Sequence, residues 1–134
     1  MISVGIVGAS GFTGEELVKL LLKHPDVSLD VLTSRTYAGK QVSDCIEIDT
    51  NINKKFLEPS IDNLSDCDVV FFASPNGVAM DMARDLVKND IRLVDISADF
   101  RIPDPDIWEK WYGQKHACPE LIEQSEYGLP EMKN

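Results

Sequence analysis

The fold is decided by one stretch near the amino terminus, Ile2-Ser3-Val4-Gly5-Ile6-Val7-Gly8-Ala9-Ser10-Gly11-Phe12-Thr13-Gly14. Residues 2–7 are rich in β-branched side chains and predict a strand. After the stretch, Leu17, Leu20 and Leu21 recur at helical spacing and predict an amphipathic helix. The order of strand, glycine turn and helix is typical of the first unit of a parallel α/β sheet.

The three glycines Gly8, Gly11 and Gly14 lie between the predicted strand and the predicted helix. Glycine at such a turn permits positive φ and lets a ligand approach the backbone closely. Free amide groups at the helix start bind a pyrophosphate without any basic side chain. We therefore predict a dinucleotide site here, and the alternative is a tight turn with a purely structural role.

The first helix has a predicted signal at each end. Thr13 with Glu16 could form a capping box, and Pro25 disfavours helical geometry at His24. A second strand over Val27–Thr33 follows almost at once. Such a short β-α-β unit requires a right-handed crossover between parallel strands.

The same alternation continues through the middle of the chain. Asp68–Ala73 predicts a strand buried on both faces, and Leu93–Ile96 predicts another strand. Between them a helix ends at Asn89-Asp90, and its predicted inner face consists of Val78, Met82, Leu86 and Val87. We therefore expect a single α/β domain over residues 1–134, with the doubly wound, mostly parallel sheet of a Rossmann fold.

The other regions carry weaker signals. The polar stretch Ser34–Asp66 contains one possible short strand, Lys55–Leu57, and short helical fragments are expected over 107–112 and 120–125. We expect the last eight residues, 127–134, to form a loop. Three aromatic residues at helical spacing are expected in the core and both histidines at the surface: Trp108, Trp111, Tyr112, His24 and His116.

Composition excludes several classes of function. The chain has 134 residues and a formal net charge of −10, so its field repels nucleic acids and anionic membranes. No apolar run approaches the roughly 18 residues of a membrane span. Three cysteines without a C-x-x-C pair predict reduced thiols of a cytoplasmic protein and no metal site: Cys45, Cys67 and Cys118.

The end of the second strand indicates which dinucleotide is bound. An NAD site places an acid there to bond the ribose 2′-hydroxyl. Here Ser34 and Arg35 follow the strand, and Asp26 and Asp30 lie before its end. A hydroxyl and a guanidinium suit a 2′-phosphate, so we predict NADP. The alternative is that Arg35 is a solvated loop charge and that Asp30 reaches the ribose.

Two polar segments follow the later strands at the same predicted edge of the sheet. Ser74-Pro75-Asn76-Gly77 comes after the central strand, where open α/β sheets bind ligands, although it could be an ordinary turn. Ser97-Ala98-Asp99-Phe100-Arg101 could be a site or a structural Asp-Arg pair. The residues predicted to contact the cofactor are Gly8, Ser10, Gly11, Phe12, Thr13, Gly14, Ser34, Arg35, Ser74 and Pro75.

Four of these segments occur in this order in one family. Residues 8–14, residues 33–40 (Thr-Ser-Arg-Thr-Tyr-Ala-Gly-Lys), residues 97–101 and residues 127–131 (Tyr-Gly-Leu-Pro-Glu) resemble the N-acetyl-γ-glutamyl-phosphate reductases of arginine biosynthesis, which are related to the semialdehyde dehydrogenases. The resemblance covers nearly the whole chain. Residues 74–77 depart slightly from the family's commoner Leu-Pro-His-Gly.

The resemblance implies NADPH-dependent reduction of an acyl phosphate to an aldehyde with release of phosphate. In the family a cysteine attacks the acyl phosphate, the thioester accepts hydride, and a histidine acts as acid and base. The family's catalytic cysteine and histidine would both lie beyond Asn134, and none of the three cysteines present matches its motif. We therefore expect this chain to be the cofactor domain without the catalytic substrate domain, and to be inactive alone.

Three readings remain open at this point. The chain is a domain of such a reductase, a domain of an aspartate-semialdehyde-dehydrogenase-like enzyme, or a free-standing NADP-binding regulatory module. For the enzymes we expect a small-molecule substrate and a full-length protein that forms a homo-oligomer.

Overall fold

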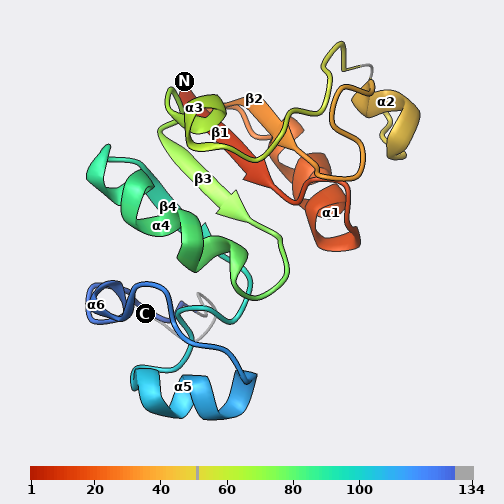
Figure 1. Cartoon of the computed structure of the whole chain (residues 1–134). Helices are drawn as coiled ribbons and strands as arrows, with labels where there is room; N and C mark the ends of the chain where they lie inside the picture. The colour runs from red at the N-terminus through yellow and green to blue at the C-terminus, as the bar shows by residue number, and fades with distance from the viewer. Residues whose placement is uncertain (51, 129–134) are drawn as a thin grey trace.

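The computed structural model describes residues 1–50 and 52–128, and its centre is a sheet with the strand order β2-β1-β3-β4 (Figure 1). All three pairs of neighbouring strands are parallel. The strands are β1 (Ile2–Val7), β2 (Val27–Thr33), β3 (Val69–Phe72) and β4 (Arg92–Asp95). The predicted α/β fold with a parallel sheet is confirmed.

Helices cover both faces of this sheet. The longer ones are α1 (Phe12–Leu22), α4 (Val78–Lys88) and α5 (Pro105–Tyr112). The single-turn helices are α2 (Val42–Cys45), α3 (Ile61–Leu64) and α6 (Pro119–Ile122). Because side chains alternate along a strand, β1 directs Val4 and Ile6 into one buried cluster and Val7 into another. The sheet is therefore doubly wound.

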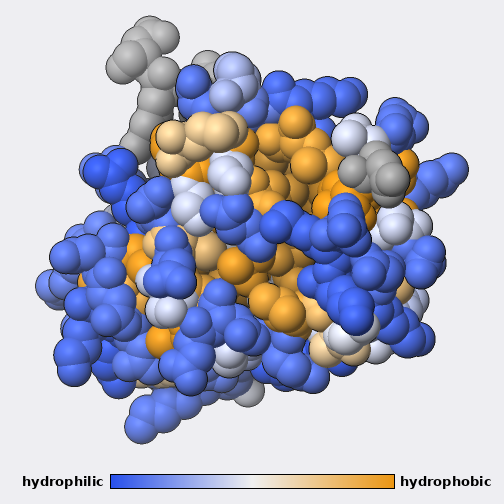
Figure 2. Space-filling view, turned by 90° about the horizontal axis from the view of Figure 1, so that it is seen from above, coloured by the Kyte–Doolittle hydropathy of each residue, from blue (hydrophilic) through white to orange (hydrophobic). Residues whose placement is uncertain are grey.

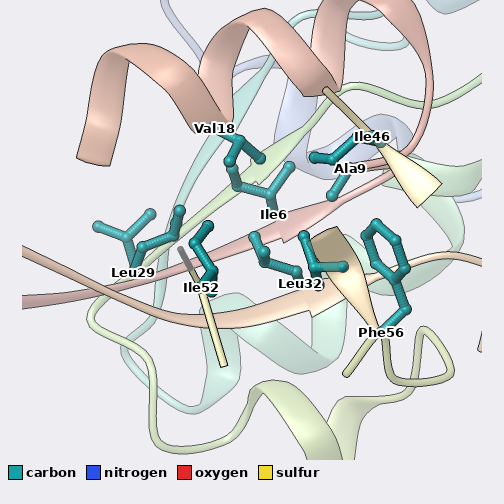
Figure 3. Packing of buried hydrophobic residues seen from close by; sticks show 10 residues of the cluster. Ile6, Ala9, Val18, Leu29, Leu32, Ile46, Ile52 and Phe56 are labelled. Carbon is teal, nitrogen blue, oxygen red and sulfur yellow. The ribbon is translucent and has the colours of Figure 1, made fainter. Parts of the chain in front are cut away.

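The first cluster lies between α1, the strands and the segment after β2. Figure 3 shows Val18 of α1 above Ile6 of β1, with Leu32 of β2 and Phe56 completing the packing. Full burial of each such aliphatic side chain contributes about 1.5 to 3 kcal/mol. This packing fixes the position of α1 relative to the ends of β1 and β2.

The second cluster joins β3 to α3 and α4. Val70 and Phe72 are buried there against Leu64 and Leu86. Val69 and Phe71 point to the other face and are only partly buried. The prediction of a strand buried on both faces therefore holds fully for one face of β3 and partly for the other.

The expected face of α1 needs correction. The helix begins at Phe12 with Gly11 as its N-cap, and no side chain caps it, so the predicted Thr13–Glu16 capping box is wrong. Leu20 is 67% exposed, whereas Val18 is completely buried. The register of α1 places Val18 directly over the sheet and Leu20 well round the helix from it, because consecutive residues are about 100° apart.

Two further expectations about helix faces are wrong. Val87 is 40% exposed, because Leu86 occupies the buried position of that turn of α4. Trp111 is 76% exposed, whereas Trp108 is fully buried with its ring 5.1 Å from that of Tyr112. Helix α5 is covered on one side only, and residues four apart, such as 108 and 112, share that side.

The segment between β2 and β3 has little regular structure. Lys55 and Leu57, predicted as a strand, form only isolated bridges to Gln41 and Thr33. Of the predicted loop at 127–134, residues 127 and 128 are neither helix nor strand, and residues 129–134 lie outside the described residues.

Apolar side chains also reach the surface. Figure 2 shows them gathered in the middle of one face, with hydrophilic residues around them. In the part of the chain that the structure describes, no helix has the length and apolar character needed to cross a membrane.

His116, expected at the surface, is only 3% exposed. Its Nε2 lies 2.6 Å from the carbonyl oxygen of Asp99, and its Nδ1 accepts a hydrogen bond of 3.1 Å from the backbone N–H of Cys118. Because Nδ1 is an acceptor, the ring proton is on Nε2, which donates to Asp99. The edge-to-face contacts with Trp108 and Phe100 complete its packing. His24 is exposed, as expected.

We predict that His116→Ala lowers the free energy of unfolding by about 2 to 4 kcal/mol, because it removes two buried hydrogen bonds and leaves a cavity beside Trp108. Urea unfolding followed by tryptophan fluorescence measures this. The exposed His24→Ala is the matched control and should change stability by no more than about 0.5 kcal/mol. Equal stability of the two variants would contradict the structural role of His116.

Candidate functional site

The carboxyl ends of β1 and β3 form the point where the order of the sheet reverses. From β1 the chain continues to β2 on one side, and β3 then pairs with the opposite side of β1. Ligands of open α/β sheets bind in the crevice at such a switch point. The glycine-rich loop, Gly8–Gly14, follows β1, and the turn Ser74–Gly77 follows β3, so both predicted segments meet there.

Two of the three glycines are required by packing. Gly8 has a φ of +83° and lies so close to β3 that a Cβ would overlap the carbonyl of Ala73. A Cβ on Gly14 would overlap the carbonyl oxygen of Gly8. Side chains at either position would push the loop, the helix and β3 apart.

Gly11 differs from the other two. Its φ of −78° suits any residue, and the nearest atom to a Cβ there is the carbonyl oxygen of Gly8 at 3.8 Å. The space beside Gly11 is therefore open, and a ligand can approach this part of the backbone. Since the fold does not need a glycine here, the absence of a side chain fits ligand binding.

The amino terminus of α1 is free to bind an anion. No side chain caps it, so the amide groups of its first turn, Phe12–Gly14, receive no acceptor from the N-cap residue. Phe12 is 95% exposed, and Thr13 is exposed as well. Unpaired amides and the helix dipole together attract a phosphate.

Ser10 and Ser34 join the glycine-rich loop to the end of β2. Their hydroxyl oxygens are 2.8 Å apart, and the Oγ of Ser34 also accepts a hydrogen bond of 3.0 Å from the N–H of Tyr37. Ser34 is buried, so its hydroxyl positions the two loops. Arg35 is exposed, and within residues 1–50 and 52–128 its guanidinium has no hydrogen-bond or ion-pair partner.

A second cation in the loop after β2, Lys40, was missed by the sequence reasoning. Lys40 places its Nζ 5.6 Å from the centre of the Tyr37 ring, in the same loop after β2. The only sequence feature that could have pointed to Lys40 is its position in residues 33–40, one of the segments that carry the family resemblance.

Asp30 lies in the middle of β2, between the residues that pair with Val4 and Gly5, and not at the carboxyl end of the strand. Its carboxylate accepts hydrogen bonds of 2.5 Å from the hydroxyls of Ser28 and Ser3, which lower its pKa. Ser3 is near the start of β1, whereas the glycine-rich loop is at the end of that strand. This placement argues against Asp30 as the ribose ligand.

The turn after β3 carries an unsatisfied polar atom. The Oγ of Ser74 is buried and has no hydrogen-bond partner among the described residues, while Pro75 is exposed. The side-chain oxygen of Asn76 accepts a hydrogen bond of 3.1 Å from the N–H of Ala98. A buried hydroxyl without a partner at the switch point fits a ligand group that bonds to it.

Asp99 holds the start of α4. Its carboxylate is completely buried and accepts hydrogen bonds from the backbone N–H groups of Gly77, at 2.9 Å, and Met80, at 3.0 Å. Arg101 is exposed, so the expectation of an Asp-Arg structural pair is wrong. Since Asp99 already supplies an anion to the amino terminus of α4, the open anion site at this edge is that of α1.

Asp95, at the end of β4, also has a partly unsatisfied carboxylate. Its Oδ1 accepts hydrogen bonds from both the N–H and the hydroxyl of Ser97, whereas its Oδ2 is buried without a partner in the described part of the chain. Burial raises the pKa of Asp95, and the nearby carboxylate of Asp99 adds to the increase.

Two of the three cysteines, Cys67 and Cys118, are poorly suited to nucleophilic chemistry. Cys118 is buried, its thiol donates to the carbonyl oxygen of Met80, and burial raises its pKa to about 11. Burial also raises the pKa of Cys67. A thiolate is the reactive form, so neither is activated. No cluster of three or more potential metal ligands occurs among the described residues.

Comparison with curated proteins gives close relatives. The chain is 50% identical to the N-acetyl-gamma-glutamyl-phosphate reductase of Alkalilimnicola ehrlichii, over 98% of this chain and 39% of that protein. It is 52% identical to the reductase of the same name from Cellvibrio japonicus, over 98% of this chain and 38% of that protein. The chain thus spans about two fifths of the length of these relatives.

Solved structures show the same fold at lower identity. Aspartate semialdehyde dehydrogenase with NADP from Candida albicans matches with a TM-score of 0.65 at 22% identity, over 87% of this chain and 40% of that chain. Dihydrodipicolinate reductase from Paenisporosarcina matches with a TM-score of 0.54 at 19% identity, over 71% of this chain and 37% of that chain.

The family model described as semialdehyde dehydrogenase, NAD binding domain, matches residues 3–134, which include the glycine-rich loop, the Ser74–Gly77 turn and Asp99. The chain therefore belongs to the semialdehyde dehydrogenase family as its NAD-binding domain.

Proposed function

We propose that this chain is the NADPH-binding domain of an enzyme that reduces N-acetyl-glutamyl 5-phosphate to the 5-semialdehyde with release of phosphate. The observation that supports cofactor binding is the uncapped amino terminus of α1 at the switch point, beside the open space at Gly11. The two reductases that are 50% and 52% identical to the chain support the choice of substrate.

In this proposal each of three loops at the carboxyl edge of the sheet binds one part of the cofactor. The amides of Phe12–Gly14 would hold the pyrophosphate at the end of β1. Arg35 and Lys40 would hold the 2′-phosphate after β2, since cations pair with phosphate. The remaining half then lies over β3, where Ser74 has its unsatisfied hydroxyl.

In this proposal the bound cofactor supplies hydride, and the residues of this chain bind and orient it. The backbone amides at the start of α1 would stabilise the negative charge of the pyrophosphate. No basic side chain is then needed there, although the chain has a net charge of −10. Gly8 keeps the loop close to the end of β3, and Gly14 keeps α1 close to the loop, so that the two ends of the site stay at a fixed spacing.

The nucleophile and the acid-base group belong, in this proposal, to a substrate domain outside residues 1–134. Cys118 and Cys67 have raised pKa values and are buried, so neither is a nucleophile. The cytoplasmic location expected from the free cysteines, and a homo-oligomeric full-length enzyme, belong to the same proposal.

We predict that Gly11→Val abolishes NADPH binding and leaves the fold intact, because the new side chain would fill the space open to the pyrophosphate without touching the protein core. Isothermal titration and circular dichroism measure the two effects. Gly14→Ala is the contrasting variant, and its Cβ should disrupt the fold itself. Normal NADPH binding by Gly11→Val would show that the loop is only a structural turn.

We predict that NADPH binds more tightly than NADH, and that Arg35→Ala reduces this preference by about 1.5 to 3 kcal/mol, or roughly ten- to a hundredfold in Kd. The reason is the loss of a charge-assisted contact with the 2′-phosphate. Arg92→Ala removes an equally exposed arginine at the amino end of β4 and is the control. Equal affinity of the unmodified chain for both nucleotides would refute the NADP assignment.

We predict that the chain alone turns over no substrate, because general acid-base groups contribute about 10² to 10⁴-fold and the thiols of Cys118 and Cys67 are not activated. The assay is NADP reduction with N-acetyl-glutamate 5-semialdehyde and phosphate, for the unmodified chain and for Cys118→Ser. Turnover that disappears in Cys118→Ser would place the nucleophile inside residues 1–134.

A further inference from the structure

We infer that Asp99 is a positioning residue that holds the turn Ser74–Gly77 in the conformation that receives the nicotinamide half of the cofactor. This inference rests on the proposed function. Asp99 is completely buried and touches the turn through Gly77, so its effect on the cofactor passes through the turn.

The carboxylate of Asp99 binds two backbone N–H groups, one at the end of the turn and one in the first turn of α4. Both carboxylate oxygens accept from the N–H of Gly77, at 2.9 and 3.0 Å, and Oδ2 also accepts from the N–H of Met80. Charged acceptors make hydrogen bonds about twice as strong as neutral ones, and here the helix dipole of α4 adds to them. The end of the turn and the first residues of α4 are therefore fixed together.

Gly77 has the backbone conformation that this attachment uses. Its φ is +102°, which a residue with a Cβ rarely adopts, and its Cβ would lie 3.0 Å from the side-chain oxygen of Gln114. A turn of four residues without an external bond could take several conformations. The carboxylate of Asp99 selects one of them.

The segment that carries Asp99 is itself fixed from the far side. The indole N–H of Trp108 donates to the carbonyl of Ala98 at 2.7 Å, and His116 donates to the carbonyl of Asp99. The N–H of Ala98 in turn donates to Asn76 in the turn. The third buried cluster, which includes Trp108, is thus connected to the turn through residues 98 and 99.

The consequence for the ligand is local. Ser74 begins the turn and carries a buried hydroxyl without a partner among the described residues, at the end of β3. The loop after β2 is positioned separately, by the contact between Ser10 and Ser34. Loss of the Asp99 carboxylate should therefore weaken contacts over β3 and leave those of the adenosine 2′-phosphate end intact.

The test compares two ligands on Asp99→Asn. NADPH contains the nicotinamide half, and 2′,5′-ADP lacks it. An asparagine amide presents a donor to the N–H of Gly77 in place of one acceptor, so the turn loses part of its attachment. We expect the Kd of NADPH to rise roughly tenfold and that of 2′,5′-ADP to change by less than about twofold.

Two other variants complete the experiment. Asp104→Asn changes a carboxylate that also accepts two backbone N–H bonds, at the start of α5, and should alter neither Kd. Trp108→Phe removes the bond to Ala98 and part of a buried ring while leaving the Asp99 carboxylate in place, and it should show the same selective loss with a smaller factor. If thermal unfolding shows that Asp99→Asn does not fold, Trp108→Phe provides the test of the positioning role.

Each outcome is decisive. Selective loss of NADPH affinity in Asp99→Asn or, failing its folding, in Trp108→Phe supports the positioning role. An equal change for both ligands, or no change, shows a purely structural role and overturns the inference. If the unmodified chain binds neither ligand, the proposed function fails and the inference fails with it.

Discussion

The backbone of Gly8 lies directly against Ala73, and the rest of the site depends on this close approach between the loop after β1 and the end of β3. It joins the two segments on either side of the switch point without any side chain between them. Gly14 then lets α1 start immediately beside the same loop. The amino terminus of α1 is therefore fixed at the middle of the sheet edge, where an anion can reach it.

Electrostatics at this edge are local. The chain has a net charge of −10, which repels anions at long range, so binding must come from groups within a few ångströms. Two long helices begin here, and they differ in one respect. The amino terminus of α4 holds the carboxylate of Asp99, whereas α1 has no capping side chain. The distribution of caps thus directs an incoming phosphate to α1.

Sequence patterns predicted the parts that depend on local spacing. Apolar runs located all four strands, and the glycine spacing located the loop, because period and turn chemistry are properties of neighbouring residues. The assignments of Leu20, Val87 and Trp111 were wrong because tertiary packing decides which face of each helix is buried. His116 was expected at the surface, and the structural alternative for Asp99 named Arg101 as its partner; both were wrong because the actual partners include backbone atoms distant in sequence.

Buried polar atoms separate the structural part of this protein from the part suited to a ligand. Asp99 and His116 have both found partners within the chain. Among the described residues, the two buried side-chain atoms without a partner are the Oγ of Ser74 and the Oδ2 of Asp95, and both follow or end strands at the carboxyl edge. An unsatisfied buried group costs about 1 to 3 kcal/mol, so packing alone would not select such groups. Their location at the carboxyl edge, where α1 also begins, is explained if a bound ligand completes this edge.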